Sequence, residues 1–324
     1  MALRIIFCGT PVFAVPSLEY LLRKPDFQIV GVVTQPDRPS GRGQEVHSSP
    51  VKDAAAGSRI PVFQAERIKS DEGYEYFKQL APDAVVIIAY GQIISPRLIK
   101  IPRLGWINLH ASLLPKYRGA APINWAIVNG DARTGVTTMQ IDAGLDTGPT
   151  LLAYETEIAP DETAPMLAAR LAVAGAPLVA ETLKKLDRGV ITPKPQDNAH
   201  ATMARPLRKE DGRIDWSLSA HRIYNRIRGF DPWPGAYTSF RGKRCDLWGK
   251  PASEADLGAG FKLAPSGDAI ALGAIFSTGG EIFVVCGAGT FLRLEFARLE
   301  ARKRTSAWEF ANGARLEPGE RFGS

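Results

Sequence analysis

The chain has 324 residues, of which 45% are hydrophobic and 23% are charged, and its formal net charge at pH 7 is +6. This length suits two domains that each bury a core, and the composition is that of an ordinary globular protein. No stretch approaches the roughly 18 continuous apolar residues of a membrane span. The N-terminus enters a strand-like run without the three regions of a signal peptide. We therefore expect a cytoplasmic protein that does not bind membranes.

Strand and helix signals alternate along residues 1–188, a pattern typical of helices that cover a largely parallel sheet. The run "AVVIIA" at residues 84–89 is apolar throughout, as expected of a central strand buried on both faces. The chain therefore predicts an α/β domain with a doubly wound, largely parallel, Rossmann-like sheet. Strands are predicted at residues 3–9, 27–34, 60–63, 84–89, 105–110, 135–141 and 149–158, and helices at 12–24, 121–129 and 163–187.

Residues 189–206 contain several prolines and little apolar periodicity, so we interpret them as a linker. Residues 207–324 form the second predicted domain. A helix is expected at 219–227, followed by short strands at 235–240, 243–249, 268–273, 281–286 and 290–300. Short strands separated by glycine and proline turns indicate a small β-barrel.

The positive charge is concentrated near the C-terminus. Residues 205–324 hold 19 of the 40 basic and 14 of the 34 acidic residues, a net charge of +5, whereas residues 1–204 carry +1. A basic region of this kind attracts phosphate backbones, although a mildly basic solvated surface has the same composition.

Two features exclude other kinds of site. The first βα turn, "FCGTPVFA", has one glycine where a dinucleotide fingerprint needs three, so no dinucleotide site is expected. Cys8, Cys245 and Cys286 are far apart and have no CxxC or close histidine spacing. They are predicted to be free thiols, and no metal site is expected.

Asn108 and His110 lie two residues apart at the end of the predicted strand 105–110. Side chains alternate along a strand, so both project from one face at the carboxyl end, where open α/β sheets place their sites. The alternative is a hydrogen-bonded structural pair.

A glycine-rich loop, "QIDAGLDTGPT", places Asp142 and Asp146 between two predicted strands. Asp and Gly also dominate ordinary turns, which is the alternative interpretation. The functional hypothesis is a carboxylate beside the imidazole, which would hold the ring and favour its protonated form. An amide, an imidazole and a carboxylate without a serine or cysteine nucleophile suit acyl transfer between nitrogens, because the amide and the protonated imidazole can stabilise an oxyanion.

The segments "NLHASLLPKYRGAAPINWAI" (108–127) and "GVTTMQIDAGLDTGPTLL" (135–152) together resemble the folate-dependent formyltransferase family. Its members move a formyl group from 10-formyltetrahydrofolate to an amine. The Asn-x-His pair, the "SLLP" turn, "YRG" and the aspartate loop occur in order with the family's spacing. The resemblance implies 10-formyltetrahydrofolate as co-substrate and no metal.

The resemblance also implies roles for individual residues. Asn108, His110 and Asp146 would be catalytic. The "SLLP" turn, formed by Ser112, Leu113, Leu114 and Pro115, would line the folate site. The backbone of Ala89, Tyr90 and Gly91 and the loop of Asp142 would hold the pterin ring of the folate.

Three further stretches resemble family members whose acceptor is initiator methionyl-tRNA, namely "FCGTPVFAVPSLEYLL", "VTQPDRPSGRG" and "RGFDPWPGAYT". With them the similarity covers nearly the whole chain. In those members the second stretch reaches the acceptor end of the tRNA, so Arg38 and Arg42 would contact tRNA. The resemblance implies a monomer whose C-terminal domain is an OB-like tRNA-binding domain.

One departure and two alternatives remain. After "GRG" family members continue with lysines, whereas this chain has Gln44 and Glu45, which weakens the positive charge of the loop. One alternative is a sugar-nucleotide N-formyltransferase with the same folate donor, since such enzymes carry a similar "DPWPGA" and would use "DRPSGRG" as an ordinary surface loop. The other is a non-catalytic RNA-binding protein that has kept the fold.

Overall fold

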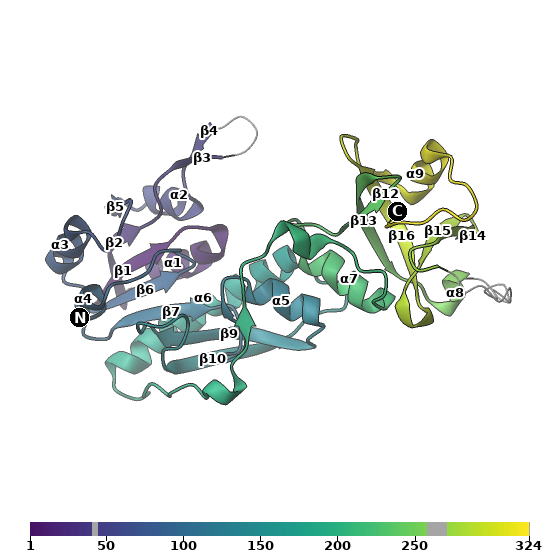
Figure 1. Cartoon of the computed structure of the whole chain (residues 1–324). Helices are drawn as coiled ribbons and strands as arrows, with labels where there is room; N and C mark the ends of the chain where they lie inside the picture. The colour runs from purple at the N-terminus through teal and green to yellow at the C-terminus, as the bar shows by residue number, and fades with distance from the viewer. Residues whose placement is uncertain (41–44, 258–270, 324) are drawn as a thin grey trace. The chain divides into compact units, whose positions relative to one another are not determined.

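The computed structural model describes residues 1–40, 45–257 and 271–323. The chain divides into two compact units (Figure 1). Unit 1 comprises Met1–Ile123, Ala132–Ile158 and Met166–Arg205, and unit 2 comprises Asn124–Asp131, Ala159–Pro165 and Pro206–Ser324. Nearly all of the predicted linker, up to residue 205, therefore belongs to unit 1.

Unit 1 is built on a seven-stranded sheet with the order β10-β9-β7-β6-β1-β2-β5. The five strands from β7 to β5 are parallel, whereas β9 runs antiparallel to β7 and β10 antiparallel to β9. Each of these strands was predicted from the sequence. Their bounds are β1 Leu3–Gly9, β2 Phe27–Val33, β5 Val62–Phe63, β6 Ala84–Ile88, β7 Trp106–His110, β9 Arg133–Gln140 and β10 Thr150–Glu157.

Helices cover both faces of this sheet (Figure 1). Phe77 of α3 stacks on Trp106 at a ring distance of 5.1 Å, while Gly175 of α6 lies against Leu109 on the other face of β7. This arrangement confirms the predicted doubly wound fold. The helices are α1 Val15–Leu22 after a 3₁₀ turn at Val12–Ala14, α2 Pro50–Ala56, α3 Asp71–Leu80, α4 Pro96–Ile99, α5 Pro122–Asn129 and α6 Ala164–Asp187.

Helix α6 is long and apolar enough, by length and composition alone, to cross a membrane. Half of its most apolar 18-residue window is buried inside the structure. A Cβ added at Gly175 would lie 2.5 Å from Leu109 Cδ2, so the helix packs closely on β7. Packing on the sheet accounts for the apolar face of α6, as in the core helices of many globular proteins.

Unit 2 contains an antiparallel sheet with the order β12-β13-β16-β15-β14, with β17 paired to β16. This confirms the predicted C-terminal β-domain. Of the strand expected at 268–273, residues 268–270 lie outside the described residues, and 271–273 precede β14 as a turn. The bounds are β12 Tyr237–Phe240, β13 Lys243–Pro251, β14 Ile275–Thr278, β15 Glu281–Val285, β16 Phe291–Leu299, β17 Thr305–Ser306, α7 Ala220–Gly229, α8 Glu254–Leu257 and α9 Ala307–Ala314.

The three cysteines are buried and unpaired, as the sequence predicts. Burial raises the pKa of Cys245 and of Cys286 to about 12, so both remain neutral thiols at physiological pH. They act as small apolar core residues.

Trp106 anchors the strand that carries the candidate site. Its ring is fully buried, and its Nε1 donates a hydrogen bond of 2.9 Å to the carbonyl of Leu98. We expect Trp106→Ala to lower the free energy of unfolding by about 3–5 kcal/mol, because it creates a large cavity and leaves that carbonyl unpaired. Urea denaturation measures the change, with exposed Val173→Ala in α6 as the control, for which a change below about 0.5 kcal/mol is expected. An equal effect in both variants would contradict the anchoring role.

Candidate active site

Strand β7 directs Asn108 and His110 to the same side of the sheet at its carboxyl end. The register pairs Asn108 with Met139 and His110 with Thr137 of β9. The His110 side chain is buried, whereas Asn108 is half-buried and its amide makes no hydrogen bond within the described part of the chain. Burial of Leu109 on the opposite face, beneath α6, fixes this orientation of the strand.

His110 is held through one ring nitrogen. Its Nε2 lies 2.8 Å from the carbonyl oxygen of Tyr117, and because a carbonyl only accepts, Nε2 carries the proton. The other nitrogen, Nδ1, faces Asp146 at 3.6 Å from Oδ2. Nδ1 is therefore the ring atom that can exchange a proton with a substrate.

Asp146 is positioned by two neighbouring segments. Its Oδ2 accepts a hydrogen bond of 2.8 Å from the backbone N–H of Gly119, and its own carbonyl accepts one of 2.8 Å from Nε2 of Gln196. Only 14% of the carboxylate side chain is exposed, which places the charge in a partly dehydrated setting. A carboxylate held in this way interacts more strongly with the facing imidazole than a solvated one would.

Gln196 and Arg118 are positioning residues that the sequence analysis missed. Nε2 of Gln196 also donates to the carbonyl of Gly148 at 2.7 Å, so the amide ties both sides of the Asp146 turn. Its Oε1 accepts from Nε of Arg118 at 3.0 Å and from a terminal guanidinium nitrogen at 2.8 Å. The "YRG" motif pointed to the region of Arg118, but no local pattern marks Gln196.

The segment that carries Gln196 packs on unit 1 through backbone pairing. Strand β11, Met203–Ala204, pairs with β8, Arg118–Gly119, and Lys194 forms a bridge with Thr150. Gly119 has a φ of +115°, and a Cβ there would lie 2.7 Å from the carbonyl of Ala204. A glycine is therefore required where the two segments meet.

The "SLLP" turn is closed by internal hydrogen bonds. Oγ of Ser112 donates to the carbonyl of Lys116 at 2.6 Å, and Oγ1 of Thr137 donates to the carbonyl of Ser112 at 2.7 Å. The N–H of Leu114 donates to the same threonine oxygen at 3.2 Å. Because the Ser112 hydroxyl is used inside the turn, a ligand would meet chiefly the backbone and the half-buried Leu113, Leu114 and Pro115.

Residues 89–92 follow the carboxyl end of β6 and present backbone. Ala89 and Gly91 are exposed, with φ values of +47° and +85°. The carbonyl of Tyr90 accepts a hydrogen bond of 2.9 Å from Nε2 of Gln35. The Tyr90 ring is buried in the core, and this burial raises the pKa of its hydroxyl. The predicted pterin contact in this segment would therefore be made by backbone groups.

Asp142 differs from Asp146 in its surroundings. It is exposed, and its Oδ1 accepts from the N–H of Gly144 at 3.0 Å and from Oγ1 of Thr147 at 2.8 Å. Bonds of this kind shape the loop that carries Asp146.

Arg38 lies in a hairpin formed by β3, Arg38–Ser40, and β4, Glu45–His47, which projects from unit 1 (Figure 1). Its guanidinium is exposed and 3.4 Å from a carboxylate oxygen of Glu66. At the base of the hairpin a hydrogen bond from Lys52 and a second one from Gln64 lower the pKa of Asp37. Arg42 and Gln44 lie in residues 41–44, outside the described residues.

Within the described ranges, no group of three or more His, Cys, Asp and Glu side chains could hold a metal ion.

Comparison with known proteins identifies the class. The Formyl transferase family model matches residues 3–183, and the model of the Formyl transferase C-terminal domain matches residues 206–315. The chain belongs to the formyl transferase family, which confirms the resemblance carried by the sequence motifs.

Full-length relatives are more specific. Proteins named methionyl-tRNA formyltransferase from Solibacter usitatus and Koribacter versatilis are 49% and 50% identical to this chain, over 99% and 98% of both chains respectively. Among solved structures, WlaRD, a sugar 3N-formyl transferase, aligns with a TM-score of 0.63 and 18% identity over 94% of this chain and all of its own. At that identity the likeness shows the fold alone.

The role of Gln196 can be tested by deletion of its amide. We expect Gln196→Ala to lower kcat for formyl transfer by about tenfold, because Asp146 then loses a hydrogen bond that fixes its backbone facing His110. Steady-state kinetics measures kcat, and Lys194→Ala in the same segment, whose side chain has no partner among the described residues, is the control.

A structural role alone would lower the melting temperature of Gln196→Ala and leave kcat of the folded enzyme unchanged. That result would contradict a positioning role.

Proposed function

We propose that this chain transfers the formyl group of 10-formyltetrahydrofolate to the α-amine of initiator methionyl-tRNA. The observation that carries the proposal is the match to relatives named methionyl-tRNA formyltransferase, which is near 50% identity and extends over both units. The His110–Asp146 pair supports it, because an imidazole beside a carboxylate suits proton transfer during acyl transfer between nitrogens.

The proposed reaction is a direct transfer. The amine of the methionyl group attacks the formyl carbon, a carbon–nitrogen bond forms, and the bond from that carbon to N10 of the folate breaks. The Asn108 amide and protonated His110 donate hydrogen bonds to the oxyanion of the tetrahedral intermediate. Asp146 sustains the charge of His110 and relays the proton lost by the amine, through water, to the departing nitrogen. No enzyme nucleophile is used.

The folate co-substrate would lie along the carboxyl end of the sheet. Exposed Ala89 and Gly91 follow β6, and the "SLLP" turn follows β7, the neighbouring parallel strand. Ligands of open α/β sheets bind outside these strand ends. The Asp142 loop would complete the pterin site, because its carboxylate holds the loop shape through Gly144 and Thr147.

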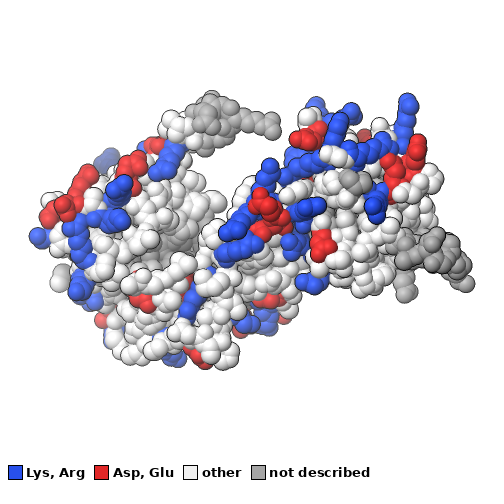
Figure 2. Space-filling model, in the orientation of Figure 1, with Lys and Arg blue, Asp and Glu red and all other residues white. Residues whose placement is uncertain are grey.

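The tRNA would be bound by the hairpin and by unit 2. On the face shown in Figure 2, Lys and Arg side chains form a run along the upper edge of unit 2, interrupted in places by acidic ones. Positive surfaces of this kind read phosphates and shape more than sequence. Because charged tRNA is a soluble substrate, the protein would act in the cytoplasm without a membrane partner. We further propose that it acts as a monomer.

The two loop aspartates should behave differently. We expect Asp146→Asn to reduce kcat by about a hundredfold or more, because an amide supplies no charge to face His110. Asp142→Asn should chiefly weaken folate binding, because its side chain shapes the loop. Steady-state kinetics with folate titration separates the two effects, and a larger fall of kcat in Asp142→Asn would reverse the assignment.

The acceptor is tested by comparing charged initiator tRNA with an amino-sugar nucleotide. We expect formylation of the tRNA alone, and we expect Arg42→Ala to lower kcat/KM for tRNA by about ten- to a hundredfold, equivalent to about 1–3 kcal/mol for a lost charged contact. The folate dissociation constant should not change, and the salt dependence of tRNA binding should become less steep.

Arg23→Ala, at the C-cap of α1, is the matched control, because this exposed arginine forms an ion pair with neighbouring Glu19 and with no other described residue. Formylation of the sugar nucleotide, or unaltered tRNA kinetics in Arg42→Ala, would favour the sugar-nucleotide alternative.

A further inference from the structure

Two glutamine side chains in unit 1 hold the exposed segment at residues 89–91. Gln35 lies just beyond β2, and its Nε2 donates a hydrogen bond of 2.9 Å to the carbonyl of Tyr90. Gln92 donates from its Nε2 to Oε1 of Gln35 at 3.3 Å, and its own Oε1 accepts a hydrogen bond of 2.8 Å from the N–H of Ile68. Both glutamines are half-buried, and they form a series of three hydrogen bonds that ends on Tyr90.

The two ends of this series fix the direction of both amides. A backbone N–H only donates, so the side-chain oxygen of Gln92 must face Ile68. A backbone carbonyl only accepts, so the side-chain nitrogen of Gln35 must face Tyr90. If one amide turned over, two oxygens or two N–H groups would face each other. Each glutamine therefore depends on the other for its orientation.

The backbone of Gln35 is held as well. Its N–H donates to Oγ1 of Thr10 at 3.3 Å, and its carbonyl accepts a hydrogen bond of 2.9 Å from Nε2 of Gln64. Gln64 also donates to the carboxylate of Asp37 at 2.8 Å. The amide that reaches Tyr90 therefore extends from a fixed backbone.

The segment that these amides hold has an unusual backbone. Ala89 and Gly91 have φ values of +47° and +85°, and a left-handed alanine persists only where its surroundings hold it. The buried ring of Tyr90 anchors the segment from the core. A Cβ added at Gly91 would lie 3.7 Å from Nε2 of Gln35, so this amide lies close to Gly91 as well.

The bond to Tyr90 determines which backbone group the segment offers to a ligand. In a planar trans peptide, the carbonyl of one residue and the N–H of the next point in opposite directions. Because the carbonyl of Tyr90 faces Gln35, the N–H of Gly91 is directed away from that amide. Gly91 is exposed, and no residue in the described part of the chain accepts a hydrogen bond from this N–H.

We propose that Gln35 and Gln92 are positioning residues of the folate site, which hold the peptide group between Tyr90 and Gly91 so that its N–H donates to the pterin ring. The ring carries a carbonyl oxygen and nitrogens that accept hydrogen bonds. The inference rests on the proposed function for its folate co-substrate, and it does not depend on the identity of the acceptor. Because the two side chains act through the backbone, they affect folate binding more than the chemical step.

Gln35→Met tests the bond to Tyr90, because methionine has a similar length and volume but no donor. We expect the dissociation constant of 5-formyltetrahydrofolate, which carries the pterin ring, to rise by about tenfold, as for one lost hydrogen bond. Calorimetric titration of the full-length protein measures it. In steady-state kinetics KM for 10-formyltetrahydrofolate should rise similarly, while kcat at saturating folate stays within about twofold of the wild-type value.

Gln92→Glu tests the direction of the series. Glutamate still accepts from Ile68 but turns a second oxygen toward Oε1 of Gln35, so the Gln35 amide has to turn its own oxygen toward Tyr90. We expect folate binding to weaken by about tenfold here too. In a Gln35→Met background the same substitution should add less than about twofold, because Gln92 acts through Gln35. Additive effects would contradict this dependence.

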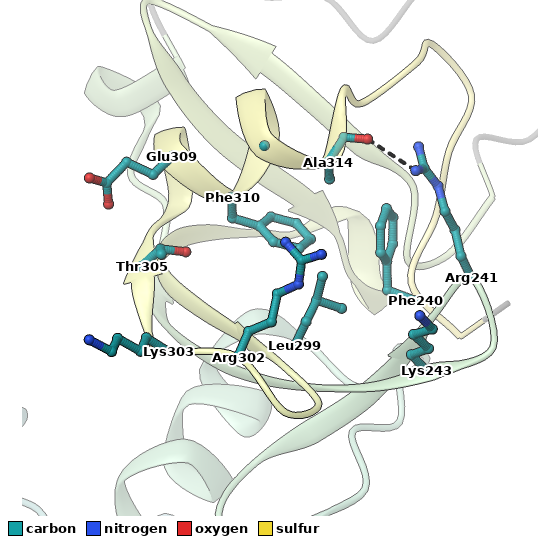
Figure 3. Close-up of a pocket in the computed structure, with 11 residues that line it drawn as sticks. Phe240, Arg241, Lys243, Leu299, Arg302, Lys303, Thr305, Glu309, Phe310 and Ala314 are labelled. Atoms are coloured by element: carbon teal, nitrogen blue, oxygen red, sulfur yellow. Dashed lines mark hydrogen bonds between the residues drawn. The ribbon is translucent and has the colours of Figure 1, made fainter.

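Two controls separate positioning from charge and from stability. Gln28→Glu makes the same substitution at an exposed residue near the amino end of β2 and should leave folate binding unchanged. Arg241 of unit 2 lines a pocket beside α9 and donates to the carbonyl of Ala314 at 3.0 Å (Figure 3). Arg241→Met removes this side-chain-to-backbone bond, so it should lower the melting temperature without changing the dissociation constant of the folate.

The proposal is overturned if Gln35→Met, folded by circular dichroism, binds 5-formyltetrahydrofolate as tightly as the wild type. A lower melting temperature of Gln35→Met with unchanged folate binding would show a structural role alone and would overturn it as well. Equal weakening by Gln28→Glu would assign the Gln92→Glu result to charge and contradict the dependence of Gln92 on Gln35.

The proposed function is scored separately, by formyl transfer to charged tRNA in the wild-type protein. A wild-type protein that binds the folate but transfers no formyl group would contradict the proposed acceptor and leave the titrations interpretable. A wild-type protein that binds no folate would overturn both proposals.

Discussion

The hydrogen bond from Nε2 of His110 to the carbonyl of Tyr117 determines how the candidate site can work. It places the proton on Nε2 and turns Nδ1 toward Asp146, so a backbone group seven residues away determines which ring nitrogen faces the carboxylate. Tyr117 and Asp146 both adopt left-handed backbone conformations, with φ values of +60° and +52°. Strained residues of this kind persist where the surrounding structure holds them, and here Gly119 and Gln196 bond Asp146 from two segments.

The pairing of β8 with β11 extends this constraint to the end of unit 1. Residues 189–205 return to the sheet and bring Gln196 to the Asp146 turn, where Arg118 bonds the other end of its amide. A segment that resembles a linker by composition thus contributes to the geometry of the site. The surroundings of the candidate site therefore depend on contacts between residues eighty positions apart, such as the hydrogen bond from Arg118 to Asn198.

Much of this fold could be predicted because its central strands are short, apolar and bounded by turn residues. The helices α2, α3, α4, α8 and α9 were not predicted, since four of them have eight residues or fewer and α3 has few apolar residues. Strand periodicity placed Asn108 and His110 on one face, which the register with β9 now shows. The hydrogen bonds of Gln196 join residues far apart in the sequence, and the one accepted by Tyr117 depends on the left-handed backbone of that residue. Neither feature leaves a periodic pattern in the sequence. Residues 189–205 belong to unit 1 because their backbone pairs with that unit, and their composition gives no sign of this pairing.

In the proposed reaction, His110 takes part in the chemical step. The most direct measurement is the single-turnover rate of formyl transfer from 10-formyltetrahydrofolate to initiator methionyl-tRNA by His110→Ala, with circular dichroism to verify the fold. We expect a rate lower by about a hundredfold or more, because a hydrogen-bond donor to the oxyanion is lost. A folded His110→Ala protein that transfers the formyl group at the wild-type rate would contradict it.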